Sequence, residues 1–116
     1  MSRADELIRI KHMLDAGNQI LRFTKDIDQK RFVADEAISL AVTRLLEIIG
    51  EASRHISSET RSRYPDVPWQ QLGGIRNRLI HAYIDVDLNI VWNICSNSVP
   101  RLVADLQKII DDAANT

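Results

Sequence analysis

FVADEAISLAVTRLLEIIGEASRHI, residues 32–56, is the stretch that decides the fold. Apolar residues recur three or four positions apart along it, which is the period of an amphipathic α-helix. A helix that faces a single core needs an apolar arc of about 100°. The arc here is wider, which suits a helix covered on two sides, either within one bundle or by its own domain and a partner chain. Two adjacent stripes make up this arc, one of Ala37, Ala41, Leu45, Ile48, Ala52 and Ile56 and one of Ile38, Val42, Leu46, Ile49 and Ser53.

The segment that precedes this stretch also has a helical period. In residues 4–23, one apolar stripe includes Gly17, where a neighbouring helix can approach closely. Ser2 and Glu6 are residue types that favour a helix start, although their spacing is not that of a capping box. Residues 26–31 are polar and are interpreted as a connection.

Prolines and glycines divide the next part of the chain. Pro65 and Pro68 end helical continuity, and a short helical turn is expected before them, at residues 58–63. Trp69 can open a further helix, which Gly73 and Gly74 interrupt. A new helix is therefore expected to begin near Ile75.

The last apolar segment, residues 87–112, predicts one more helix. Asp85 or Asp87 suits its N-cap, and Pro100 within the run predicts a kink. No alternating strand pattern of useful length is present. The sequence thus predicts an all-α fold, a bundle of four main helices in one domain that spans residues 1–116.

Composition limits the classes of function. The formal net charge of −1 gives no overall positive field for nucleic acid, so any such contact needs a local patch or a patch doubled by dimerisation. Cys95 is the only cysteine, so neither an intrachain disulfide nor a cysteine-based zinc site can form within one chain. No run resembles a signal peptide or a membrane span, and a cytoplasmic location is expected.

The stretch RNRLIHAY, residues 76–83, is the candidate site. It combines the fixed cation of Arg76 with the titratable imidazole of His81 and the phenol of Tyr83, a set that suits phosphate-ester chemistry. Residues 67–84 contain no Asp or Glu, so the segment is locally positive. Such a cluster is ordinarily a solvated helix face. The double glycine before it and the expected end of the helix near His81 favour a site instead.

Helix geometry restricts how this site can work. Five residues of a straight helix turn by about 500°, so Arg76 and His81 point about 140° apart. Either the helix ends or distorts before His81, or two copies of the motif face each other across a two-fold axis. In the second case one shared cleft would collect the arginines and histidines of both chains and supply the positive patch that a monomer lacks.

The motif resembles the Arg-X4-His-X-Tyr signature of the HEPN superfamily, in its branch of HepT toxins. Further blocks of the sequence resemble HepT proteins as well, so the resemblance covers nearly the whole chain. These blocks are residues 32–36, 46–52, 74–77, 91–92 and 99–102.

The resemblance implies a four- to five-helix HEPN bundle that forms a homodimer through its motif-bearing face. It also implies a metal-independent endoribonuclease without a cofactor, acting as the toxin of a toxin–antitoxin pair. RNA would be cleaved by attack of its own 2′-hydroxyl, leaving 2′,3′-cyclic phosphate ends. The usual antitoxin in the family is a nucleotidyltransferase of the MntA type, which transfers AMP from ATP to the motif tyrosine, here Tyr83.

The residue types fit roles in that chemistry. Arg76 would clamp the phosphate and stabilise the transition state, and His81 would act as general base or acid. Asn77 either orients the phosphate or ribose, or caps local backbone. Arg78 suits an RNA backbone contact or an ion pair, and Tyr83 can stack on a base or bond to phosphate before it is modified.

Two other functions remain open from the sequence. One is a non-catalytic helical module that docks a nucleotidyltransferase and binds nucleotide or nucleic acid. The other is a metal-dependent hydrolase that would use Glu47 and Glu51 as metal ligands. A surface ion-pair network of these two glutamates with Arg44 and Arg54 is the favoured interpretation. The remaining candidates are interpreted as structural: partly exposed His12 and His55, core anchors Trp69 and Trp92, and a buried Cys95.

Overall fold

The computed structural model describes residues 2–79 and 87–115, and every regular element in those two ranges is an α-helix. The predicted all-α fold class is therefore confirmed. Residues 75–79 are also helical. The long helices are α1 (Arg3–Thr24), α3 (Glu36–Ser53), α7 (Leu88–Asn97) and α8 (Val99–Ala114), and the short ones are α2 (Gln29–Ala34), α4 (Ser58–Arg63) and α5 (Trp69–Gly73).

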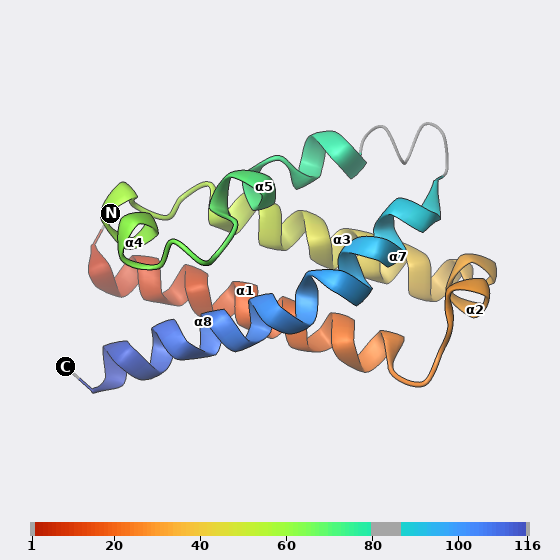
Figure 1. Ribbon diagram of the computed structural model, residues 1–116, viewed down its shortest axis with the longest axis horizontal. Helices are drawn as coiled ribbons and strands as arrows, with labels where there is room; N and C mark the ends of the chain where they lie inside the picture. The colour runs from red at the N-terminus through yellow and green to blue at the C-terminus, as the bar shows by residue number, and fades with distance from the viewer. Residues whose placement is uncertain (1, 80–86, 116) are drawn as a thin grey trace.

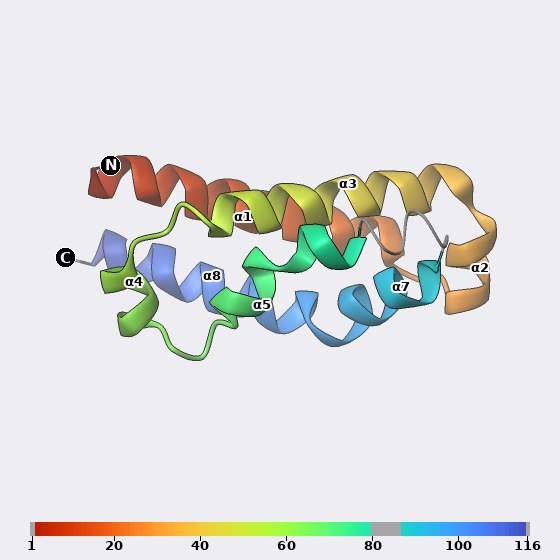
Figure 2. The same ribbon diagram turned by 90° about the horizontal axis from the view of Figure 1, so that it is seen from above.

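The helices form an elongated bundle of 45 × 27 × 20 Å (Figure 1). Helix α1 runs along the long axis and packs against both α3 and α8. Helix α2 closes one end of the bundle, where it contacts α3 and α7, and α4 lies at the other end (Figure 2). Helix α5 packs on α3. The segment that follows α5 is therefore held on the side of the bundle that α3 forms.

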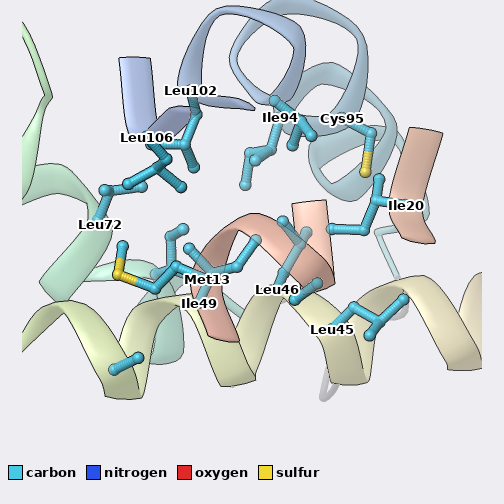
Figure 3. Packing of buried hydrophobic residues seen from close by; sticks show 14 of the residues in the cluster. Met13, Ile20, Leu45, Leu46, Ile49, Leu72, Ile94, Cys95, Leu102 and Leu106 are labelled. Carbon is cyan, nitrogen blue, oxygen red and sulfur yellow. The ribbon is translucent and has the colours of Figure 1, made fainter. Parts of the chain in front are cut away.

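One aliphatic core runs through the bundle (Figure 3). Met13 and Ile20 of α1 meet Leu46 and Ile49 of α3, and Leu106 of α8 closes the layer. Each such side chain contributes about 1.5–3 kcal/mol when it is fully buried. Gly17 allows the close approach expected of it, because a Cβ there would lie 2.7 Å from Cγ2 of Val103 in α8.

The starts of the first two helices differ from the sequence prediction. Ser2 does cap α1, but its partner in a true capping box is Asp5, three residues on, rather than Glu6. Residues 26–31 are not all connection, because α2 begins within them at Gln29. The side chain of Asp28 accepts a hydrogen bond from the backbone N–H of Arg31 at 2.8 Å and so starts this short helix.

The deciding stretch 32–56 is divided between two helices rather than being one. Asp35 is extended, and its carboxylate accepts a hydrogen bond from the N–H of Ile38 at 3.0 Å. It therefore ends α2 and caps α3, so α3 begins at Glu36. The single-helix prediction missed this break because the apolar period continues through it.

The wide apolar arc of α3 is largely covered within its own bundle. Helix α1 packs on one side of it, and α2, α5 and α7 contact it elsewhere. Leu40 remains 57% exposed and Val33 of α2 remains 42% exposed. Coverage on two sides within one bundle thus accounts for most of the arc.

The last predicted helix is two helices rather than one kinked helix. Helix α7 starts at its Asp87 cap, as expected, and ends at Asn97. Helix α8 starts at Val99, with Pro100 in its first turn. The proline lies where helix N–H groups have no intrahelical partner in any case, so it begins a new helix instead of bending an old one.

Within the described ranges, no helix combines the length and apolar character needed to cross a membrane.

Candidate functional site

The helical segment 75–79 presents the described part of the motif. Ile75 is 3% exposed and Leu79 is 2% exposed, and because they are four residues apart they face the core together. Arg76, Asn77 and Arg78 lie between them and are all exposed. The two buried residues therefore act as anchors that turn three polar side chains to the surface.

Gly74 makes the turn that starts this segment. Its N–H donates to the carbonyl oxygens of Gln70 and Gln71, both at 3.1 Å, which ends α5. Its own carbonyl oxygen accepts a hydrogen bond from the N–H of Arg78 at 3.3 Å. The interruption expected at the double glycine, with a new helix near Ile75, is thus confirmed.

Gly50 of α3 fixes the position of the segment against the bundle. A Cβ at Gly50 would lie 3.0 Å from the carbonyl oxygen of Leu72 and 3.4 Å from Cβ of Ile75. The backbone between α5 and the motif therefore sits directly on α3, at a place where a side chain on residue 50 would push its neighbours away.

Arg76 and Arg78 keep their charges available. In the part of the chain that the structure describes, no ion pair or hydrogen bond involves either guanidinium. An exposed arginine without a carboxylate partner can use its planar fork for an incoming anion such as phosphate.

His81 and Tyr83 lie outside the described residues. The angle between Arg76 and His81, and the choice between a distorted helix and a two-fold arrangement, therefore remain predictions.

A hollow of about 280 Å³ adjoins the exposed motif residues. Among the described residues, its lining contains two arginines and no carboxylate. Arg54 comes from the C-terminal end of α3, Arg61 from α4 and Asn77 from the motif. The remaining lining residues are Trp69, Gln70 and Gly73.

Arg54 and Arg61 carry no sequence signal that marks them as site residues. The sequence predicts an ion-pair network for Arg54, and Arg61 lies in the short helical turn predicted at residues 58–63, which α4 confirms. They are brought to Asn77 only by the packing of α5 on α3. No spacing or motif in the sequence indicates this juxtaposition.

The predicted ion-pair network is only partly correct. Arg44 pairs with Glu47 at 3.1 Å, but Glu51 contacts the ring of His55 at 3.4 Å instead of Arg54. Neither carboxylate lines the hollow. Among the described residues, no three His, Cys, Asp or Glu side chains are grouped so that they could hold a metal ion.

The residues interpreted as structural lie in the core or on the surface, as the sequence predicts. Trp69 is buried and donates from its indole nitrogen to the carbonyl oxygen of Tyr64 at 2.9 Å. Trp92 packs on Phe32 with ring centroids 5.3 Å apart. Burial raises the pKa of the Cys95 thiol to about 12, as expected for a small apolar residue of the core. His12 and His55 are exposed.

A second, larger cavity of about 520 Å³ lies away from the motif, between the start of α1, α4 and the end of α8. Its polar groups are largely paired with one another. Glu6 accepts from the hydroxyl of Thr60 at 2.9 Å, and Tyr64 donates to Asp112 at 2.9 Å. Of the two, the hollow beside Asn77 is the one that meets the motif.

Comparison with known proteins agrees with the motif. Residues 13–109 match the family model described as ribonuclease HepT-like. A Methanocaldococcus jannaschii protein described as a "putative RNase" is 40% identical over 92% of this chain and 98% of its own length. A Thermococcus cleftensis protein described as "probable ribonuclease HepT" is 34% identical over 86% of this chain and 91% of its own length.

No solved structure matches the chain significantly. The family model covers most of the chain, and the relatives align with it over nearly their full lengths. The chain therefore belongs to the HepT-like ribonuclease family of the HEPN superfamily.

Proposed function

We propose that this protein is a metal-independent endoribonuclease that cleaves RNA by attack of the 2′-hydroxyl on the adjacent phosphorus. The observation behind the proposal is the exposed face of Arg76, Asn77 and Arg78, which is anchored by two buried residues and carries no carboxylate among the described residues. The family supports the same reaction class, because its described relatives are named as ribonucleases.

Each motif residue has a role in the proposed reaction. Arg76 holds the phosphate and stabilises the charge that develops in the transition state. His81 transfers the proton, a contribution typically worth about 10²–10⁴ in rate. Asn77 orients the phosphate or ribose, and Arg78 contacts the RNA backbone. The products are a 2′,3′-cyclic phosphate and a 5′-hydroxyl.

We further propose that two copies of the chain form the working unit. A net charge of −1 gives one chain little attraction for RNA, and a straight helix would turn Arg76 and His81 away from each other. A two-fold axis through the motif-bearing face would place the arginine of one chain near the histidine of the other. The shared cleft would then be positive although each chain is not.

Regulation follows from the same motif. We propose that the protein is the toxin of a toxin–antitoxin pair and that a nucleotidyltransferase of the MntA type transfers AMP from ATP to Tyr83. The added nucleotide brings bulk and negative charge next to the arginines, which blocks RNA through both sterics and repulsion.

The test is an RNA cleavage assay in EDTA with protein shown by intact mass to be free of AMP. The wild type is compared with His81→Ala and Arg76→Ala, and with Arg22→Ala at the end of α1 as a control for loss of an exposed arginine. We expect cleavage with cyclic-phosphate ends for the wild type and the control, and none for the motif variants, while all four remain dimers by light scattering. Full activity of either motif variant would refute the mechanism. Absence of cleavage by the wild type would favour the non-catalytic binding module.

A further inference from the structure

We propose that the hollow lined by Arg54, Arg61 and Asn77 is a subsite for a phosphodiester group of the RNA strand next to the cleaved bond. The inference rests on the proposed ribonuclease function. It assigns binding roles to two arginines, Arg54 and Arg61, that lie outside the motif.

The lining of the hollow has the chemistry of an anion site. Arg54, Arg61, Gln70 and Asn77 line a space of about 280 Å³, and no carboxylate from the described part of the chain lines it. Arginine binds phosphate through two parallel charge-assisted hydrogen bonds, and amides can add further donors. The space is open to solvent and adjoins the surface on which the motif lies.

Arg61 is held in place before any ligand arrives. Its Nε donates to the carbonyl oxygen of Ile56 and its Nη2 to that of Ser53, both at 3.0 Å. A guanidinium has five N–H donors, so three remain after these two bonds. Because the backbone already fixes the group, little side-chain entropy is lost when those donors meet a phosphate.

Arg54 supplies a charge that no carboxylate neutralises within the described ranges. The nearest acidic residue along its helix, Glu51, contacts His55 instead. The stem of Arg54 runs over Gly73, where a Cβ would lie 3.6 Å from its Cγ. The missing side chain at Gly73 thus leaves the hollow open beside this guanidinium.

Asn77 connects the hollow to the motif. It lines the hollow, and its neighbours in the chain are Arg76 and Arg78. The proposal places the reacting phosphate at Arg76 and a neighbouring phosphate of the same strand in the hollow. In a chain of net charge −1, this juxtaposition gives a local path of cations along which an RNA backbone can lie.

The experiment measures RNA binding separately from cleavage. Binding of a labelled single-stranded oligouridylate is measured by fluorescence anisotropy in EDTA over a series of KCl concentrations, with His81→Ala as the background. We expect Arg54→Gln to weaken binding roughly 3- to 10-fold and to reduce the slope of log affinity against log salt by about 0.7. Arg22→Gln, which removes the same charge from the end of α1, should leave the affinity close to that of the background.

A second variant tests the hollow itself. Gly73→Leu keeps both arginines and fills the space between them; Gly73 lies in α5 and has no positive φ, so the backbone accepts a side chain. We expect it to weaken binding as Arg54→Gln does, with unchanged circular dichroism. Substitution of Arg61 would also remove its hydrogen bonds to the carbonyl oxygens of Ser53 and Ile56 at the end of α3, so both test variants keep this residue.

The outcomes separate the two proposals. If Arg54→Gln binds with the affinity and salt slope of the background while the wild type cleaves RNA, the subsite is wrong and the ribonuclease stands. If Arg54→Gln and Arg22→Gln lose RNA affinity equally, the loss comes from the overall charge of the chain, and the subsite proposal is wrong. If AMP-free wild type neither binds nor cleaves RNA, both proposals fail.

Discussion

The Nη2 atom of Arg61 donates to the carbonyl oxygen of Ser53 at 3.0 Å, at the point where α3 ends. The last carbonyls of a helix have no partner within it, and a cation there also meets the negative end of the helix dipole. Arg61 satisfies the carbonyl of Ser53 and, through Nε, that of Ile56. The same side chain lines the hollow beside the motif, so one residue contributes to the stability of this corner and to the proposed phosphodiester subsite.

Replacement of Arg61 should destabilise the fold more than replacement of its neighbour Arg63. Arg61→Met removes the donor to the carbonyl oxygen of Ile56 and leaves that of Ser53 with only the N–H of Ile56, at 3.3 Å. We expect the free energy of unfolding to fall by about 1–3 kcal/mol. Arg63→Met removes only an exposed contact with Glu59 at 3.3 Å, worth about 0–0.5 kcal/mol. Urea unfolding of both variants measures the difference, and equal losses would show that the two bonds of Arg61 contribute nothing.

A methyl group at Gly50 should damage both the stability and the site. In Gly50→Ala the new Cβ would meet the carbonyl oxygen of Leu72 at 3.0 Å, and the backbone before Arg76 must move to relieve the contact. We expect a loss of about 1–3 kcal/mol in the free energy of unfolding and a lower rate of RNA cleavage.

The matched control for this change is Gly74→Ala. A Cβ there makes only ordinary contacts at 3.6 Å, and Gly74 has right-handed helical angles, so alanine should be neutral or slightly stabilising. The thermal stability and the rate of RNA cleavage are measured for both variants. Wild-type activity of folded Gly50→Ala would mean that the approach of α3 does not position Arg76.

The stability of the contact between α1 and α4 should depend on acid pH through Glu6. Burial of this carboxyl opposes its ionisation, but hydrogen bonds from the N–H of Ser57 and the hydroxyl of Thr60 outweigh it and hold the pKa of Glu6 below 4.5. A lowered folded-state pKa gives stability that is complete above the unfolded value and is lost as the pH falls through the folded one.

The expected readout is a difference between wild type and Glu6→Gln. The wild type should be the more stable at about pH 7, by no more than ~1 kcal/mol because the group is largely solvated, and the gap should close as the pH falls through the lowered pKa of Glu6. Glu59→Gln, which changes an exposed carboxylate of α4, serves as the control and should show little gap at either pH. If the difference in stability between the wild type and Glu6→Gln grew as the pH fell, the pKa of Glu6 would be raised by folding rather than lowered.

Loss of the hydroxyl of Tyr83 should prevent the proposed antitoxin from silencing the ribonuclease. Tyr83→Phe should keep its ribonuclease activity, because phenylalanine can still stack on a base, but it should gain no AMP when incubated with an MntA-type nucleotidyltransferase and ATP. Intact mass and residual cleavage measure the two effects.

Tyr64→Phe is the control for that experiment. The hydroxyl of Tyr64 donates to Asp112 at 2.9 Å at the far cavity, away from the motif, so this variant should still be modified and silenced. Transfer of AMP to Tyr83→Phe at the wild-type rate would assign the acceptor to another residue.

Much of the helical layout could be predicted from the sequence, because it depends on local signals. The turn at Gly74, the short helix before Pro65 and the cap at Asp87 all follow from residue types that act within one turn of backbone. Two of the errors, the missed helix boundaries, are of one kind. An apolar period that ran unbroken through Asp35, and another through Ser98, concealed two helix boundaries, since periodicity alone does not show which polar side chain turns back to cap the chain.

The sequence by itself determined the family, the all-α class and the motif residues, because these depend on residue identity and on spacing along the chain. Only the tertiary structure decided what lies beside the motif. Arg54 and Arg61 meet Asn77 because Gly50 lets α5 and the segment after it rest directly on α3. That contact joins residues far apart in sequence through backbone approach and packing, and no local pattern of charge or hydrophobicity encodes it.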